Sequence, residues 1–127
     1  MRVLLDTHLL LWALGAPARL PPKARRIIRD AEVYVSAASI WEISIKAALG
    51  KLRADPHEVL AALEPAGFLS LPIAGEHAAR VASLPPVHRD PFDRLLVAQA
   101  LVEPMHMLTD DAVLEGYGEI VGGEFYS

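Results

Sequence analysis

The chain has 127 residues, of which 53% are hydrophobic and 22% are charged. This length and composition fit one folded domain spanning residues 1–127, and they exclude an intrinsically disordered chain. The sequence has no cysteine, which excludes disulfide scaffolds, thiolate nucleophiles, iron–sulfur clusters and cysteine-ligated zinc. Its first apolar run is too short for a signal peptide and no window resembles a membrane span, so we expect a cytoplasmic protein without a membrane partner.

Charge is distributed unevenly along the chain. The net charge is −4, but residues 1–102 carry twelve basic and ten acidic side chains, whereas residues 103–127 carry six acids and no Lys or Arg. Five cations fall within one eleven-residue stretch: Arg19, Lys23, Arg25, Arg26 and Arg29. Such a run indicates either a solvated helix face or a contact with an RNA backbone.

Short apolar runs alternate with helical patterns, which is typical of βαβ units and a mostly parallel sheet. In chain order, we expect strands at residues 2–6, 32–36, 68–72, 106–109 and 118–121. We expect helices at about residues 22–30, 37–49, 56–64, 76–84 and 91–102. Gly50 is placed to end the second of these helices, and Asp90-Pro91 to begin the last one. The chain is therefore predicted to have an α/β fold.

Four acids are predicted to meet at one edge of this sheet. Asp6 ends the first strand, and Asp111 lies two residues beyond the strand that ends at Thr109. Ligands of open parallel sheets bind outside the carboxyl ends of the strands. Glu42 lies early in a helix that starts at the same edge. Asp93 occupies the first turn of its helix on the apolar stripe, so we expect its carboxylate to face the fold.

Each acid also has a purely structural explanation. Asp6 or Thr7 could cap the following helix, Ser39 and Glu42 match a capping box, and Glu42 could pair with Lys46 one turn on. The remaining acids could complement helix dipoles. Taken singly, these explanations are favoured at every position. Taken together, four carboxylates at one edge would repel one another unless a cation compensates them.

An all-carboxylate cluster indicates Mg²⁺ or Mn²⁺, because these ions prefer oxygen ligands. Zinc is disfavoured, since the five histidines show no HExxH or HxxxH spacing. A metal held by carboxylates can promote phosphodiester hydrolysis. The sequence contains no phosphate-binding GxxxxGK[ST] or GxGxxG loop and no GxSxG serine motif. Near His88, the cations Arg89 and Arg94 could hold a phosphate or could balance the local acids.

Four segments in register resemble the PIN-domain family, and within it the VapC-type toxins of bacterial type II toxin–antitoxin pairs. The segments are residues 3–12 (VLLDTHLLLW), 35–43 (VSAASIWEI), 88–100 (HRDPFDRLLVAQA) and 108–111 (LTDD). The resemblance implies a three-layer α/β/α fold with a central, mostly parallel sheet of four to five strands. It also implies an endoribonuclease that depends on Mg²⁺ or Mn²⁺ and is neutralised by a cognate VapB-type antitoxin.

The family's acidic set falls on Asp6, Glu42, Asp93 and Asp111, and its helper hydroxyl falls on Thr109. We expect Asp6, Asp93 and Glu42 to anchor the metal, directly or through waters, while Asp111 completes the site or holds a second ion. Neighbouring residues with supporting roles are Thr7, which could orient waters or carboxylates, Asp90, an N-cap first and an outer-shell ligand second, and Asp110, which could replace Asp111.

Large apolar side chains suggest association. We expect most of them to lie in the core, but they are more than small helices can all bury, so some could form a homodimer contact or a groove for an antitoxin helix. The set is Trp12, Leu14, Trp41, Leu60 and Leu63. Two other functions remain open. One is a nuclease that cuts flaps or single-stranded DNA, and the other is a module that binds a metal or a partner without turnover.

Overall fold

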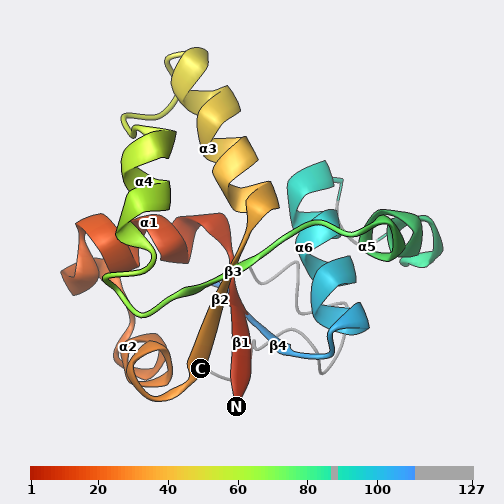
Figure 1. The fold of residues 1–127 in the computed structure, drawn as a ribbon, viewed down its shortest axis with the longest axis horizontal. Helices are drawn as coiled ribbons and strands as arrows, with labels where there is room; N and C mark the ends of the chain where they lie inside the picture. Colours follow the sequence, from red (N-terminus) through yellow and green to blue (C-terminus); the bar gives the residue numbers. More distant parts are fainter. Residues whose placement is uncertain (87–88, 111–127) are drawn as a thin grey trace.

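The computed structural model describes residues 1–86 and 89–110 (Figure 1). Within these residues, four strands form one parallel sheet in the order β3-β2-β1-β4. The strands are β1 (Arg2–Leu5), β2 (Glu32–Ser36), β3 (Leu69–Leu71) and β4 (His106–Leu108). In the register, Val3 of the central strand β1 pairs with Val33 on one side and with His106 on the other. The predicted strand at residues 118–121 lies outside the described residues.

Helices cover both faces of the sheet, as Figure 1 shows. They are α1 (Thr7–Gly15), α2 (Pro22–Asp30), α3 (Ala37–Ala48), α4 (Pro56–Ala62), α5 (Gly75–Arg80) and α6 (Pro91–Val102). Side chains of a strand alternate between the two faces. Accordingly, Val3 and Leu5 of β1 pack in one core with residues of α1 and α2, whereas Leu4 packs in a second core with residues of α6. The three-layer α/β/α architecture is confirmed.

The ends of the elements follow local chemistry. Helix α3 ends at Ala48, one residue before its predicted end, and Gly50 lies just beyond it as predicted, at a φ of 71°, a left-handed conformation that glycine adopts without strain. The helix predicted at residues 76–84 is shorter, because α5 ends at Arg80 and a 3₁₀ turn follows over Val81–Ser83. Leu84 is then extended, as expected for a residue that precedes a proline.

The large apolar side chains divide into two groups. Leu63 is buried, and Trp12 and Leu14 pack against the core. Trp41 and Leu60, in contrast, are 56% and 52% exposed and line a groove of about 660 Å³ between α3, α4 and β3. In the described part of the chain, no helix is both long and apolar enough to cross a bilayer.

Candidate metal centre

Helices α1 and α3 both begin at the carboxyl edge of the sheet. Because β1 and β2 run parallel, the helices that directly follow them both begin at this edge (Figure 1). Strand β4 ends beside β1, with Leu5 paired to Leu108, so Thr109 arrives at the same place. Helix α6 packs against α3. The topology thus brings together segments that lie about a hundred residues apart in the sequence.

Asp6 lies at the centre of this edge and is only 4% exposed. One carboxylate oxygen, Oδ1, accepts the Leu9 N–H at 2.8 Å and so caps α1, while Oδ2 accepts the Thr109 hydroxyl at 2.6 Å. Burial raises the pKa of Asp6 to about 6, partly offset by these two hydrogen bonds; the nearby charge of Asp110 raises it further, and His8 lowers it. The fold therefore holds a carboxylate whose charge the protein alone compensates poorly.

Glu42 is fixed by side chains on both of its carboxylate oxygens. Thr7 Oγ1 donates to Oε1 at 2.6 Å and also contacts Ser39 Oγ at 3.0 Å. The Lys46 ammonium lies 2.6 Å from Oε2, one helical turn further along α3. Glu42 is 5% exposed. Because Thr7 follows Asp6 directly, these contacts place Glu42 on the same side of the edge as Asp6.

Asp90 and Asp93 enter the site from α6. Asp90 caps this helix as predicted, accepting the N–H groups of Phe92 and Asp93 through Oδ1 at 2.8 and 3.0 Å. Asp93 is half-buried in the first turn. Both carboxylates are close enough to Lys46 to raise its pKa, after the larger contribution of its hydrogen bond with Glu42. The Lys46 ammonium therefore interacts electrostatically with three carboxylates, one on α3 and two at the start of α6.

The structure therefore brings Asp6, Glu42, Asp90 and Asp93 toward one edge, whereas Asp111 lies outside the described residues. One sequence-based interpretation changes. The capping box at Ser39 is wrong, because α3 begins at Ala37 and its N-cap is Ser36, whose Oγ accepts the Ala38 N–H at 2.9 Å. The predicted pair of Glu42 and Lys46 is confirmed. The proximity of Lys46 to Asp90 and Asp93 was not predicted, because it depends on the packing of α6 against α3.

The donor set suits a hard divalent cation. All candidate ligands are carboxylates, which Mg²⁺ and Mn²⁺ prefer. Oδ1 of Asp6 accepts a hydrogen bond from Leu9 and Oδ2 accepts one from Thr109, which leaves each oxygen a lone pair for a cation. The Lys46 ammonium already provides positive charge beside Glu42, Asp90 and Asp93, as a cation at this place would. The residues present therefore fit a metal, with Lys46 as the competing charge.

A second set of candidate ligands lies elsewhere. Within residues 1–86 and 89–110, the group whose ligand atoms lie within 4.8 Å of one another is Glu76, His77 and Glu103. His77 Nδ1 accepts the Ala74 N–H at 2.9 Å, so the proton of the neutral ring is on Nε2, where it is donated to Glu103 at 2.5 Å. With both ring nitrogens engaged in this way, the contacts favour a structural hydrogen bond over a metal site.

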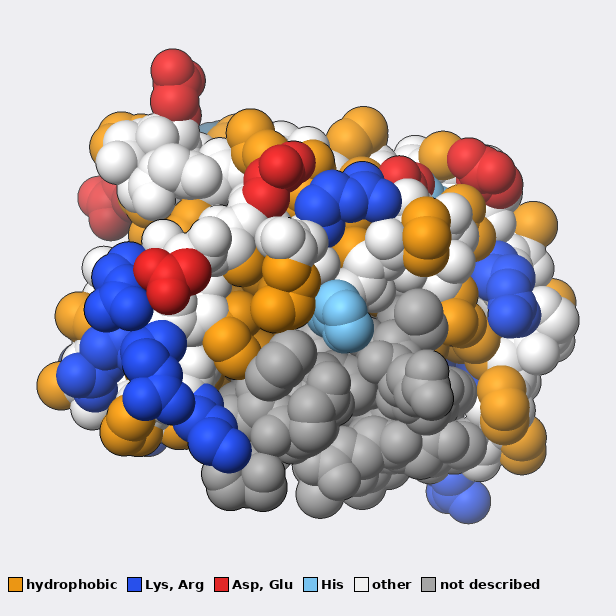
Figure 2. All heavy atoms as spheres, turned by 90° about the horizontal axis from the view of Figure 1, so that it is seen from below, with side chains coloured by type: hydrophobic (Ala, Val, Ile, Leu, Met, Phe, Trp, Pro, Cys, Tyr) orange, Lys and Arg blue, Asp and Glu red, His pale blue; other side chains and the backbone are white. Residues whose placement is uncertain are grey.

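The predicted phosphate-binding cations differ in their surroundings. Arg94 donates to the carbonyl oxygens of Val81 and Pro85, both at 3.1 Å, and so ties the preceding loop to α6. Arg89 is exposed. The five cations of the basic stretch are exposed on and before α2, which leads into the amino end of β2, away from the acids. Figure 2 shows Lys and Arg side chains gathered on this side of the molecule.

Replacing Asp90 with alanine is expected to lower the free energy of unfolding by about 1 kcal/mol, because the first turn of α6 loses an acceptor for two N–H groups. Urea unfolding measures this loss. Asp90→Ser is the matched control, since serine removes the same charge but keeps a capping oxygen. Equal losses in the two variants would show that charge, and not capping, is the source of the stabilisation.

The model of the family described as PIN domain matches residues 3–120. Among solved structures, the crystal structure of VapBC2 from Rickettsia felis bound to a DNA fragment from their promoter is similar, with a TM-score of 0.68 and 11% identity. The match covers 95% of this chain and 96% of that chain, and at this identity it supports the fold alone. No significant match is found among curated proteins.

Proposed function

Because the chain belongs to the PIN domain family, we propose that it is a metal-dependent endoribonuclease, the toxin of a type II toxin–antitoxin pair. The observation that carries the proposal is the gathering of Asp6, Glu42 and Asp93 at one sheet edge, with Lys46 as a compensating charge. Buried acids that need a cation are typical of sites that use one for chemistry. We assign Mg²⁺ to the site, with Mn²⁺ as a substitute.

In this proposal, Asp6, Glu42, Asp93 and Asp111 hold the cation directly or through waters. A cation held by these residues would supply positive charge to activate water toward an RNA phosphodiester and to neutralise charge on the leaving oxygen. Thr109 orients the Asp6 carboxylate through the 2.6 Å hydrogen bond, and Thr7 does the same for Glu42. Such supporting contacts keep ligating oxygens in place.

The partners we propose are a cognate VapB-type antitoxin and a second copy of the chain, in the cytoplasm. An exposed apolar groove lined by Trp41 and Leu60 supports an association surface, because large apolar patches on a folded protein usually mark binding sites. One similar solved structure is of VapBC2 bound to a DNA fragment from its promoter. Arg89, Arg94 and the basic stretch are candidate contacts for RNA phosphates.

Purified protein incubated with total cellular RNA and with matched single-stranded DNA, in Mg²⁺ or EDTA, tests the proposal. We expect cleavage of RNA that requires metal and is abolished in Asp6→Asn and Asp93→Asn, because each variant removes a negatively charged ligand while keeping nearly the same shape. Circular dichroism of both variants serves as the control for folding.

Two results would contradict the proposal. Cleavage of DNA alone would identify a DNA nuclease. Metal binding by the native protein without cleavage of either nucleic acid would identify a non-catalytic binding module.

A further inference from the structure

Two helices that carry the proposed ligands, α3 and α6, are joined at two points. At the outer point, the rings of Trp41 and Phe92 meet edge to face, with centroids 5.2 Å apart and planes at 74°. At the inner point, Ser36 Oγ donates to Gln99 Oε1 at 2.5 Å. Glu42 lies six residues after Ser36, and Asp93 lies six residues before Gln99. The helices are therefore paired in opposite directions.

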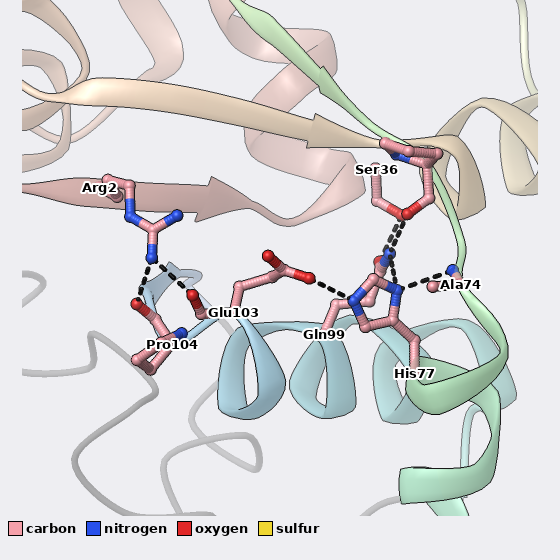
Figure 3. A network of polar contacts seen from close by, with 8 residues as sticks. Arg2, Ser36, Ala74, His77, Gln99, Glu103 and Pro104 are labelled. Atoms are coloured by element: carbon pink, nitrogen blue, oxygen red, sulfur yellow. Dashed lines mark hydrogen bonds and ion pairs between the residues drawn. The ribbon is translucent and has the colours of Figure 1, made fainter.

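Gln99 is a fully buried polar side chain whose amide is bonded at both ends (Figure 3). Its Nε2 group lies 3.3 Å from both the Pro72 carbonyl oxygen and His77 Nδ1. Ser36 Oγ uses its proton on Gln99 and its lone pair on the Ala38 N–H at the start of α3. The amide thus holds the hydroxyl that caps the helix carrying Glu42.

His77 determines which way this amide points. Its Nδ1 accepts from Ala74, and its Nε2 proton faces Glu103. Only the NH₂ end of Gln99 can therefore face Nδ1 favourably, which leaves Oε1 directed at Ser36. As Figure 3 shows, one continuous set of contacts leads from the end of α6 through α5 to the start of α3.

We propose that Gln99 is a positioning residue for the acid site: together with Ser36, it sets the separation of α3 and α6 and thereby that of Glu42 and Asp93. The inference rests on the proposed metal site and deepens it. Gln99 touches neither acid, so it acts only through helix placement. Burying an amide in an apolar helix interface is costly unless every group is bonded, and a fully bonded network holds its elements in one arrangement.

The test uses Gln99→Met, which keeps the length of the side chain but removes both polar ends. Two properties are measured: the Mn²⁺ dissociation constant by calorimetry, and Trp41 fluorescence in a Trp12→Phe background. We expect Mn²⁺ binding to weaken about 10- to 100-fold, as for other residues that orient ligands indirectly. We also expect the Trp41 emission to shift, since its contact with Phe92 depends on the same separation.

Val33→Ala is the matched control, because it trims the other core of the sheet and so lowers stability without touching the network. Its Mn²⁺ affinity should remain native. If Gln99→Met fails to fold, Ser36→Ala and Ser36→Thr replace it. The first should weaken Mn²⁺ binding, and the second, which keeps the hydroxyl, should restore it. The Ser36→Ala, Gln99→Met double variant should bind no more weakly than the weaker single variant.

The proposal is overturned if Gln99→Met lowers the melting temperature but leaves both Mn²⁺ affinity and Trp41 emission native, because Gln99 then has a structural role only. The same holds if Ser36→Thr binds as weakly as Ser36→Ala. A native protein that binds no Mn²⁺ would instead contradict the proposed function. In that case, the Trp41 emission of Gln99→Met still decides whether this residue sets the helix separation.

Discussion

Replacing Asp6 with asparagine is expected to stabilise the metal-free protein by about 3 kcal/mol at pH 7.5. The pKa of Asp6 is about 6 in the folded protein and 3.8 in the reference state. Between these pH values the Asp6 carboxyl is protonated in the folded protein but ionised in the unfolded chain, so the free energy of unfolding falls as pH rises from about 4 to about 6. Above pH 6, Asp6 is ionised in both states, and the folded protein carries the full penalty of a buried carboxylate. The stabilisation of Asp6→Asn should therefore vanish near pH 4.

Asparagine can keep both contacts at this position, because its oxygen can accept from Leu9 while its NH₂ group donates to the Thr109 hydroxyl. Urea unfolding in EDTA at pH 4 and pH 7.5 measures the effect. Asp55→Asn is the matched control: Asp55 also caps a helix, through the His57 N–H, but it is exposed. We expect a change below about 0.5 kcal/mol there. A destabilised Asp6→Asn at pH 7.5 would contradict the account.

Replacing Lys46 with methionine is expected to have opposite effects on stability and on metal binding. In EDTA, the free energy of unfolding should fall by about 1–3 kcal/mol, since the buried Glu42 carboxylate loses its charged partner. The Mn²⁺ dissociation constant should fall about 5- to 10-fold, because a nearby positive charge no longer opposes the ion. Urea unfolding and calorimetry measure the two quantities.

Lys51→Met serves as the control, because Lys51 is exposed beyond the end of α3. Neither quantity should change there beyond error. If Lys46→Met bound Mn²⁺ more weakly than the native protein, the Lys46 ammonium would favour metal binding instead of opposing it. The interpretation of Lys46 as a competing charge would then be wrong.

Much of the fold and part of the site could be predicted because local signals coincide with the elements. The strand at residues 32–36 and the helix at residues 91–102 have the predicted bounds, since apolar runs and Asp90-Pro91 specify them locally. The carboxyl ends of parallel strands lie at one edge of the sheet, and the sequence therefore predicts Asp6 and Glu42 at this edge.

Side-chain partners across helices could not be predicted in the same way. Gln99 looks like one polar residue in an apolar helix, and its contact with Ser36 crosses 63 positions of sequence. Likewise, the effect of Asp90 and Asp93 on Lys46 depends on the packing of α6 against α3. The capping box was misassigned because serines at 36 and 39 both precede apolar turns. Only the helix start distinguishes them.

Mn²⁺ binding, measured by electron paramagnetic resonance on the native protein and on two variants, decides where the metal is held. Asp93→Asn removes a proposed ligand at the carboxyl edge. Glu76→Gln alters the separate group that includes His77 and Glu103. We expect Asp93→Asn to lose the bound Mn²⁺ signal and Glu76→Gln to retain it. Retained binding in Asp93→Asn together with lost binding in Glu76→Gln would place the metal at the group of Glu76, His77 and Glu103, and the proposed site at the carboxyl edge would be wrong.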